Sequence, residues 1–241
     1  MSPRILLLQA REPDDPIRLQ EIGCFARACE VPGERIATHD LLARPPTLEE
    51  IRRHDVLMVG GSAICSVSRC DLPRQAETLE VLRQVAEVGH PVFASCFGFH
   101  LFVEALGGEL VHDAEQWETG SYPVTLTVDG RRDRLFEYLP DTFIAQVGRH
   151  DRATRLPPGA IHLAFSERAP YQAFHLPGRP FWATQFHPEL TAQDSRERFL
   201  RYRSIYGGDL TEEQAAEVVA AYRESPEAHE LPRRFLRLVF G

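Results

Sequence analysis

The chain has 241 residues, of which 43% are hydrophobic and 26% are charged, and its formal net charge at pH 7 is −8. This length allows one large domain or two small ones, and the acidic balance argues against a broad nucleic-acid-binding surface. Lys and Asn are both absent, which excludes a Walker-type phosphate loop, a lysine Schiff base and a papain-like Cys-His-Asn triad.

The first half of the chain alternates short apolar runs with segments of helical periodicity. The first run, ILLLQA at 5–10, is followed by no small-residue cleavage site and fits a strand better than a signal peptide. The elements predicted after it are helix 17–29, strand 34–42, helix 46–54, strand 55–61, helix 72–90, strand 91–96 and helix 97–108. This alternation predicts βαβ units in a doubly wound, mostly parallel sheet with helices on both faces.

The clearest of these helices is predicted over 72–90. Its apolar residues recur at helical spacing and are expected to form one buried side, and Gly89 is expected to end the helix. These apolar residues are Leu79, Leu82, Val85 and Val88.

The second half of the chain has a different pattern, in which Gly and Pro turns separate short strands. Strands are predicted at 121–130, 142–148, 160–166, 171–176 and 180–186, some of them antiparallel. Helices at 192–206 and 211–224 and an amphipathic segment at 232–240 follow. We expect one α/β domain with a helical C-terminal tail, which either packs back on the domain or forms a homodimer or partner surface.

The cysteines do not indicate a disulfide framework or a metal site. Their number is odd, and they lie at Cys24, Cys29, Cys65, Cys70 and Cys96. Cys24 and Cys29 are five apart in a predicted helix, which turns their side chains roughly 140° apart. We therefore expect no metal and treat these two as small apolar residues.

Cys96 has a different context, because it lies where a predicted strand passes into a helix. Ligands bind beyond the carboxyl ends of the strands in open α/β sheets. A sharp turn there lifts the side chain out of the sheet, and Gly98 lets the backbone cross closely. The helix dipole favours a thiolate. Cys96 is thus a candidate nucleophile. The alternative interpretation is that Cys96 is a buried strand residue and Gly98 a glycine required for packing.

A second motif supplies a base. His187 follows the apolar strand 180–186, and Glu189 comes two residues later. A cysteine nucleophile needs a base, and that base needs an orienting carboxylate. A turn with a surface Glu is the alternative interpretation, and His150 with Asp151 is a lesser candidate pair.

A third motif, VLMVGGSA at 56–63, ends a buried strand with Gly60 and Gly61. Such glycines can present backbone N–H groups to a developing oxyanion, together with the N–H of Phe97. The alternative interpretation is that the two glycines form an ordinary turn after the strand.

Together these motifs resemble class I, triad-type glutamine amidotransferase domains, most of all stand-alone proteins similar to the amidotransferase domain of GMP synthase. The similarity is carried by VGGS, by PVFASCFGFHLFVEALGGEL around Cys96 and by ATQFHPEL near the distal end. The segments ETGSYPVTLT, GRHDRATRLPPGAIHLAFSE and YQAFHLPGRPFWATQFHPE agree with it as well. The resemblance covers residues 1–205 and implies a flavodoxin-like fold, with 206–241 as a helical extension.

The resemblance implies a catalytic role for three residues. Cys96 is the nucleophile that attacks the γ-carboxamide of glutamine, His187 is the general base and then the acid, and Glu189 orients His187. A γ-glutamyl thioester forms, and water releases glutamate. No cofactor is implied.

The resemblance also implies a substrate pocket. The backbone N–H groups of Gly61 and Phe97 hold the oxyanion, and Gly60 shapes that loop. Ser121 and Tyr122 fall where the family places backbone that contacts the α-amino and α-carboxylate groups of the substrate.

One position departs from the family pattern C-x-G-x-Q. His100 stands where the family has a Gln that lines the glutamine pocket. A histidine has a different shape and can carry charge near neutral pH. It can still contact a carboxylate, or it can mean that free glutamine is not the substrate.

Three functions remain open from the sequence. The first is glutamine hydrolysis that feeds ammonia to a separate synthetase subunit, since neither a phosphate loop nor a synthetase domain is present in these residues. The second is hydrolysis of another γ-glutamyl peptide or amide, which His100 favours. The third is a non-catalytic binding or regulatory module with the same fold. No apolar run approaches the roughly 20 residues of a membrane helix, and we expect a cytoplasmic location.

Overall fold

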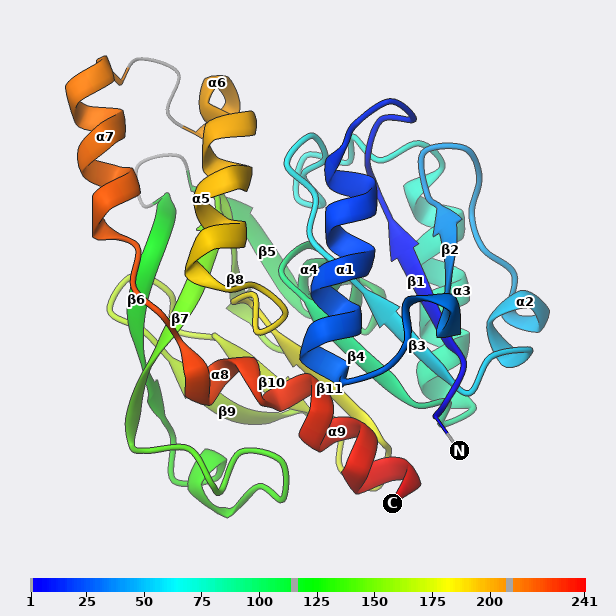
Figure 1. Ribbon diagram of the computed structural model, residues 1–241. Coiled ribbons are helices and arrows are strands. Elements are labelled where there is room, and N and C mark those ends of the chain that lie inside the picture. Colours follow the sequence, from blue (N-terminus) through cyan, green and yellow to red (C-terminus); the bar gives the residue numbers. More distant parts are fainter. Residues whose placement is uncertain (1, 114–116, 207–209) are drawn as a thin grey trace.

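The computed structural model describes residues 2–113, 117–206 and 210–241. Within these residues the centre of the molecule is a nine-stranded sheet (Figure 1). In spatial order its strands are β2 (Ile36–Asp40), β1 (Ile5–Gln9), β3 (Val56–Val59), β4 (Val92–Ser95), β11 (Phe181–Thr184), β10 (Ala173–His175), β9 (Ile161–Phe165), β6 (Glu118–Leu126) and β7 (Thr142–Arg149). A separate small sheet pairs β5 (Glu109–His112) with β8 (Asp151–Arg155).

Helices cover both faces of the central sheet. Those in the described part of the chain are α1 (Ile17–Cys29), α2 (Leu48–Arg52), α3 (Gln75–Glu87), α4 (Phe97–Ala105), α5 (Ala192–Arg201), α6 (Arg203–Tyr206), α7 (Glu212–Ala221), α8 (Pro226–His229) and α9 (Leu231–Phe240). Short 3₁₀ turns lie at Gly33–Arg35 and Gly130–Arg132.

The sheet is mixed in direction. Strands β2, β1, β3, β4 and β11 run parallel to one another. Strands β10, β9, β6 and β7 continue the sheet with antiparallel pairs. The predicted flavodoxin-like fold, a doubly wound parallel sheet with added antiparallel strands, is therefore confirmed.

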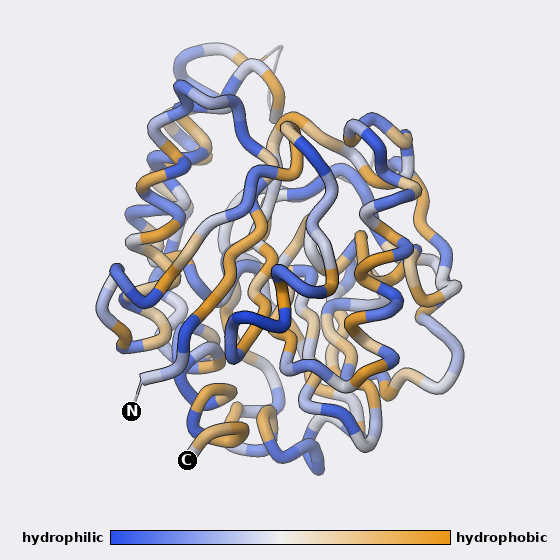
Figure 2. Tube along the Cα trace, turned by 90° about the vertical axis from the view of Figure 1, so that its right-hand side faces the viewer, coloured by the Kyte–Doolittle hydropathy of each residue, from blue (hydrophilic) through white to orange (hydrophobic). Residues whose placement is uncertain are grey.

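The apolar runs of the parallel strands are buried on both sides, as the sequence predicts. All five residues of β1 are buried. Leu7 packs in one core cluster with Phe25 of α1, and its neighbour Leu8 packs in the other cluster with Leu82 of α3. Successive side chains of a strand point to opposite faces, so one strand supplies both cores. Figure 2 shows hydrophobic residues gathered along the central strands.

The helix predicted over 72–90 is shorter and slightly rotated. It ends at Glu87, and Val88 is the C-cap residue with 53% of its surface exposed. Thr78 is fully buried with Leu82 and Val85, whereas Leu79 is half-buried. The prediction that Val88 belongs to the buried side was wrong, because Val88 lies beyond the last helical residue.

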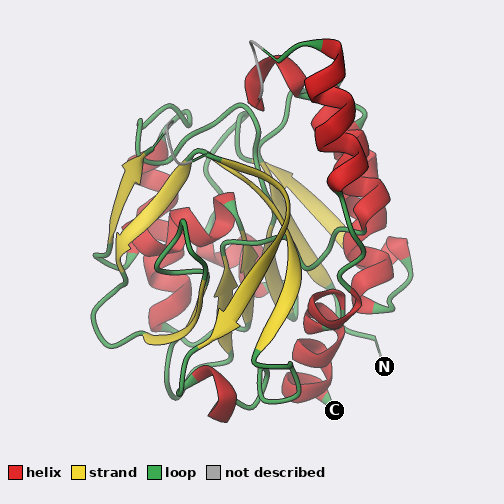
Figure 3. Ribbon diagram, turned by 90° about the vertical axis from the view of Figure 1, so that its left-hand side faces the viewer, coloured by secondary structure: helices red, strands yellow, loops and turns green. Residues whose placement is uncertain are grey.

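The C-terminal tail packs back on the domain. The Phe235 side chain of α9 is fully buried, and its ring centroid lies 5.4 Å from that of Phe93 on β4 and 5.9 Å from that of Trp182 on β11. Figure 3 shows the helices of the C-terminal segment alongside the antiparallel strands. Of the two interpretations of the tail, packing on its own domain is the one observed. None of the helices in the described ranges has the length and apolar character that crossing a membrane requires.

Candidate active site

The candidate residues meet because they follow strands that are neighbours in the sheet. β4 pairs in parallel with β11, with Ser95 opposite Thr184. β3 flanks β4 on the other side. Parallel neighbours end at the same edge, so the residues after these three strands gather there. The backbone N–H of Cys96 donates to the carbonyl of Thr184 at 2.8 Å, which ties the two strand ends together.

Cys96 lies at a strained turn between β4 and α4. Its backbone has φ 51° and ψ −101°, in a region that non-glycine residues rarely adopt. Such a conformation costs on the order of 1–3 kcal/mol and persists only where the surroundings impose it. A Cβ on Gly98 would lie 2.6 Å from the carbonyl oxygen of Val59, so this turn requires glycine.

His187 and Glu189 form a buried pair. The Nδ1 atom of His187 lies 2.7 Å from Oε1 of Glu189, and the two residues are 7% and 0% exposed. The backbone N–H of His187 donates to the carbonyl of Gln146 on β7 at 2.8 Å. The ring is thus held by both a carboxylate and the sheet.

Electrostatics favour the charged form of both members of this pair. Burial alone lowers the pKa of His187, but the Glu189 carboxylate and Cys96 outweigh it and raise that pKa to about 10. Burial alone raises the pKa of Glu189, but His187 and Arg198 hold it below its ordinary value. The imidazolium of His187 is therefore held between the Glu189 carboxylate and Cys96.

The Gly60–Gly61 loop lies against the imidazole. A Cβ on Gly61 would lie 2.5 Å from Cε1 of His187. The N–H of Gly98 donates to the carbonyl of Gly60 at 3.1 Å, which fixes the plane of the peptide that carries the Gly61 N–H. Neither that N–H nor the N–H of Phe97 donates a hydrogen bond to any residue that the structure describes. Both are free to bind an oxyanion.

Cys96, Phe97 and His100 line a cavity of about 270 Å³. Cys96 is only 4% exposed, and its Sγ lies 3.3 Å from the carbonyl oxygen of Gly148. The thiol therefore reaches this cavity from a nearly buried position.

Asp151 supplies negative charge to the same cavity. Its carboxylate accepts hydrogen bonds from Ser66 Oγ and lies 2.9 Å from Nδ1 of His112. Burial raises the pKa of Asp151, but His100, His112 and Ser66 hold it below its ordinary value. A substrate in this cavity meets an ionised carboxylate.

His100 lies in the cavity wall and contacts a neighbouring amide. Its Nε2 lies 2.6 Å from Oε1 of Gln185, and only 4% of the residue is exposed. Burial lowers the pKa of His100 despite the nearby Asp151 and Gln185. Burial thus favours the neutral form of the ring, and of the two states that the sequence allows, the structure supports the uncharged one.

The side chains of Ser121 and Tyr122 are held by contacts within the protein. Ser121 Oγ donates to Oε1 of Gln146 at 2.9 Å and accepts from the backbone N–H of Arg223 at 2.9 Å. Tyr122 donates through its hydroxyl to the carbonyl of Thr119 at 3.3 Å. In the part of the chain that the structure describes, neither residue lines the Cys96 cavity. Ser121 instead anchors the C-terminal tail.

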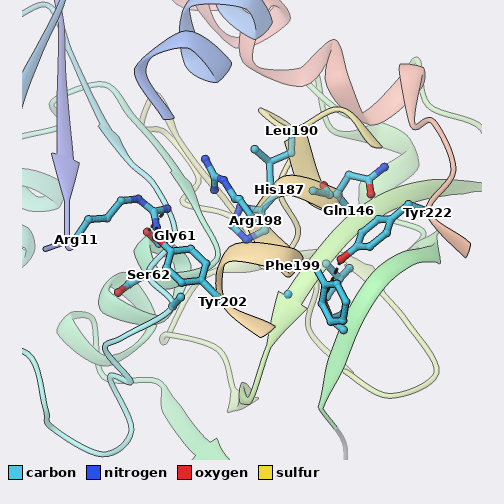
Figure 4. A pocket seen from close by; sticks show the side chains of 15 residues that line it. Arg11, Gly61, Ser62, Gln146, His187, Leu190, Arg198, Phe199, Tyr202 and Tyr222 are labelled. Carbon is cyan, nitrogen blue, oxygen red and sulfur yellow. Dashed lines mark hydrogen bonds between the residues drawn. The ribbon is translucent and has the colours of Figure 1, made fainter. Parts of the chain in front are cut away.

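A smaller cavity of about 40 Å³ is lined by His187 and Gly61. Figure 4 shows Arg11, Arg198 and Tyr202 near Gly61 and His187 in its wall. The sequence analysis missed these residues, together with Glu21, which pairs with Arg11. One signal was available, because Glu21 follows Ile17 by four residues on the apolar side of the first helix, where a carboxylate needs a partner.

Comparisons with known proteins agree with this geometry. A family model described as "Glutamine amidotransferase class-I" matches residues 46–205. The GMP synthase [glutamine-hydrolyzing] of Nitratiruptor sp. is 29% identical over 184 residues, which are 76% of this chain and 32% of that protein. The corresponding enzyme of Nitrosomonas eutropha is 32% identical over 158 residues, or 64% of this chain and 28% of that protein. The chain thus spans about a third of the length of these curated relatives.

Solved structures share the whole fold. A glutamine amidotransferase from Thermotoga maritima matches with a TM-score of 0.75 and 19% identity, covering 100% of both chains. A glutamine amido transferase from Methylobacillus flagellatus matches with a TM-score of 0.72 and 21% identity, covering 98% of this chain and 93% of the other.

Proposed function

The chain belongs to the class I glutamine amidotransferase family, and from this premise we propose that it hydrolyses a γ-glutamyl amide. The substrate proposed first is glutamine, which yields glutamate and ammonia. The proposed machinery is a Cys96–His187–Glu189 triad with oxyanion donors at Gly61 and Phe97.

The first half of the proposed reaction makes a thioester. The Cys96 thiolate attacks the γ-carbonyl carbon, and the carbonyl electron pair moves onto oxygen, where the N–H groups of Gly61 and Phe97 stabilise it. The tetrahedral species collapses, the carbon–nitrogen bond breaks, and His187 gives its proton to the departing nitrogen. Ammonia leaves, and the γ-glutamyl group stays on sulfur.

The second half consumes water. Neutral His187 takes a proton from water as the oxygen attacks the thioester carbon, and the same N–H groups hold the new oxyanion. Collapse then breaks the carbon–sulfur bond, which releases glutamate and restores the thiolate beside the imidazolium. Glu189 keeps its charge throughout and stabilises the imidazolium.

One observation supports this proposal most. A single imidazole contacts Glu189 at 2.7 Å, lies directly against Gly61 and has its pKa raised in part by Cys96. Base, orienting carboxylate, oxyanion loop and nucleophile are therefore neighbours. A buried ionic cluster and a strained cysteine are costly to keep without a use, which argues against a non-catalytic module.

A second candidate function is hydrolysis of a γ-glutamyl peptide or amide other than free glutamine. The contact between His100 and Gln185 favours it, because a rigid neutral ring occupies the wall where the family pattern has a Gln. A hydrogen-bonding change of this kind in a closed pocket can change substrate preference strongly.

A separate synthetase subunit that receives the ammonia is the proposed partner. It is suggested by the relatives, whose printed name is GMP synthase [glutamine-hydrolyzing] and whose length exceeds the matched part about threefold. The acceptor of the ammonia is best sought by adding candidate synthetases to the assay and measuring whether glutamine turnover rises.

A substrate panel tests the proposal. Purified protein is incubated with L-glutamine and with γ-glutamyl dipeptides, and released glutamate and ammonia are measured. In parallel, 6-diazo-5-oxo-norleucine labels the nucleophile, and intact mass reports the adduct. Cys96→Ala should lose both turnover and label. The matched control is Cys70→Ala, which removes an exposed thiol and should keep both. Turnover of the peptides without glutamine supports the second function, and an unlabelled Cys96 without turnover refutes both.

A further inference from the structure

Glu21 is a carboxylate with no exposed surface, buried on the inner side of α1. Arg11 binds it with two parallel hydrogen bonds, from Nε at 3.1 Å and from NH2 at 2.7 Å. Gln9 donates a third at 2.9 Å. A charge buried this completely needs both a counter-charge and hydrogen bonds, and Glu21 has both.

The Glu21–Arg11 pair supports the loop that carries the proposed oxyanion donor. A Cβ on Gly60 would lie 2.6 Å from Oε1 of Glu21, so the carboxylate packs directly under the loop. Arg11 NH2 donates to the carbonyl of Gly61 at 3.0 Å. The position of the Gly61 peptide, and hence its contact with His187, depends on these two side chains.

Glu21 also lies near a second arginine, Arg198 of α5, which links it to Glu189. The NH2 atom of Arg198 lies 3.7 Å from Oε1 of Glu21, and its NH1 atom lies 3.9 Å from Oε1 of Glu189. Gln20 accepts a hydrogen bond from Arg198 Nε at 2.9 Å and holds the guanidinium in place. In the view of Figure 4, Arg11 and Arg198 approach Gly61 and His187 from two directions.

The charges of this cluster balance. Two carboxylates, Glu21 and Glu189, are matched by two guanidinium groups, Arg11 and Arg198. In the reactive state of the proposed mechanism, the thiolate of Cys96 is matched by the imidazolium of His187. Other titratable groups beside the cluster include Tyr202, which accepts from Arg11 NH1 and donates to Asp15, and Cys29, whose pKa is raised by burial and by Glu189. Cys24 lies near Arg198, Arg27 and Asp194.

We propose that Glu21 is a positioning residue of the active site. Through Arg11, Glu21 fixes the position of the Gly60–Gly61 loop, which carries the proposed oxyanion donor. Through Arg198, it affects the electrostatic field at Glu189 and hence at the base His187. This inference rests on the proposed function for its effect on turnover, but the arrangement of charge can be tested on the Cys96 thiol alone.

The test removes one charge of each sign. Glu21→Gln leaves surplus positive charge near the thiolate–imidazolium pair, and Arg198→Gln leaves surplus negative charge. The pH profile of Cys96 alkylation by iodoacetamide, followed on the Cys96 peptide by mass spectrometry, should move to lower pH in the first variant and to higher pH in the second. A shift of roughly half a pH unit or more is expected for one buried charge.

Turnover of the preferred γ-glutamyl substrate supplies the second readout. Glu21→Gln should lower kcat by about 10- to 100-fold with KM within about threefold, because positioning acts in the transition state. Arg53→Gln is the control, since it removes an arginine charge from an exposed ion pair at the end of α2 (Arg53 to Glu49, 2.6 Å). Its kcat and alkylation profile should match those of the unmodified protein.

Shifts of the same sign in both variants, or no shift in either, would overturn the proposal and leave Glu21 as a structural residue. Arg198→Gln carries the test alone if Glu21→Gln does not fold, because a purely structural role gives no shift to higher pH. If no substrate is turned over, the proposed function fails, while the alkylation profiles still decide the role of Glu21.

Discussion

Gly61→Ala should inactivate the site while leaving the fold intact. The Cβ of alanine would lie 2.5 Å from Cε1 and 3.3 Å from Nε2 of His187. Ordinary contact begins near 3.4 Å, so the ring or the loop must move by about 1 Å. The backbone of Gly61 lies outside the left-handed region, so the new methyl group acts through this contact and not through backbone strain.

The size of the effect follows from the packing around His187. The ring is 7% exposed, and its Nδ1 is fixed at 2.7 Å from Glu189. It cannot shift by 1 Å without lengthening that bond or changing its angle to Cys96. A misplacement of this size costs about 100-fold in kcat. We therefore expect a kcat for the preferred γ-glutamyl substrate about 100-fold below that of the unmodified protein, with a similar loss in the rate of Cys96 alkylation near pH 7.

Gly33→Ala is the matched control, because nothing lies within 4 Å of the Cβ that it adds. Steady-state kinetics and thermal unfolding are measured on both variants. The control should keep its kcat within about twofold, and both should unfold within a few degrees of the unmodified protein. A Gly61→Ala variant with more than a third of the normal kcat would refute the contact between this loop and the base.

Three further predictions concern the residues around the thiol. Glu189→Gln should lower kcat by roughly 10³- to 10⁴-fold and still leave measurable turnover above Cys96→Ala, because orientation contributes less than nucleophilic attack; equal residual rates would contradict an orienting role. His100→Gln should raise kcat/KM for free glutamine relative to a γ-glutamyl dipeptide by about tenfold, the effect of one hydrogen bond; an unchanged ratio would exclude His100 from recognition. The raised pKa of His187 stabilises the fold fully below its unfolded value of about 6.5, and this contribution is lost as pH rises towards about 10. The stability difference between the unmodified protein and His187→Gln, measured by urea unfolding, should therefore shrink from pH 6 to pH 10, and a constant difference would contradict the charged pair.

Much of the fold was predictable because its signals are local. Apolar runs bounded by glycines locate the parallel strands, and the buried strand β1 needs no long-range information. The small sheet of β5 and β8 was missed, since Glu109–His112 and Asp151–Arg155 are short and largely polar. Their pairing depends on where the chain returns after the long strands β6 and β7, and no local pattern records that.

The candidate site likewise has a part that local sequence predicts and a part that depends on the tertiary structure. Cys96, His187 and Glu189 could be singled out because each follows a recognisable strand end. That β4 and β11 are neighbours, which brings those ends together, comes from the order of strands in the sheet. The buried network behind the site could not be predicted as a network. Glu21 lies in α1, Arg11 in the loop after β1 and Arg198 in α5, and their contacts form only in the folded chain.

The C-terminal tail contacts the residues that hold His187 and Glu189 in place. His229 Nδ1 lies 2.9 Å from the carbonyl oxygen of Pro188, the residue between His187 and Glu189. Gln146, whose carbonyl accepts from the backbone of His187, also donates through its side chain to the carbonyl of Arg223 at 2.7 Å and to Ser225. The family-model match ends at residue 205, yet the tail beyond it braces the proposed catalytic loop from two directions. Residue 205 thus marks the end of the family-model match, while the contacts that hold the loop of His187 and Glu189 in place continue into the tail as far as His229.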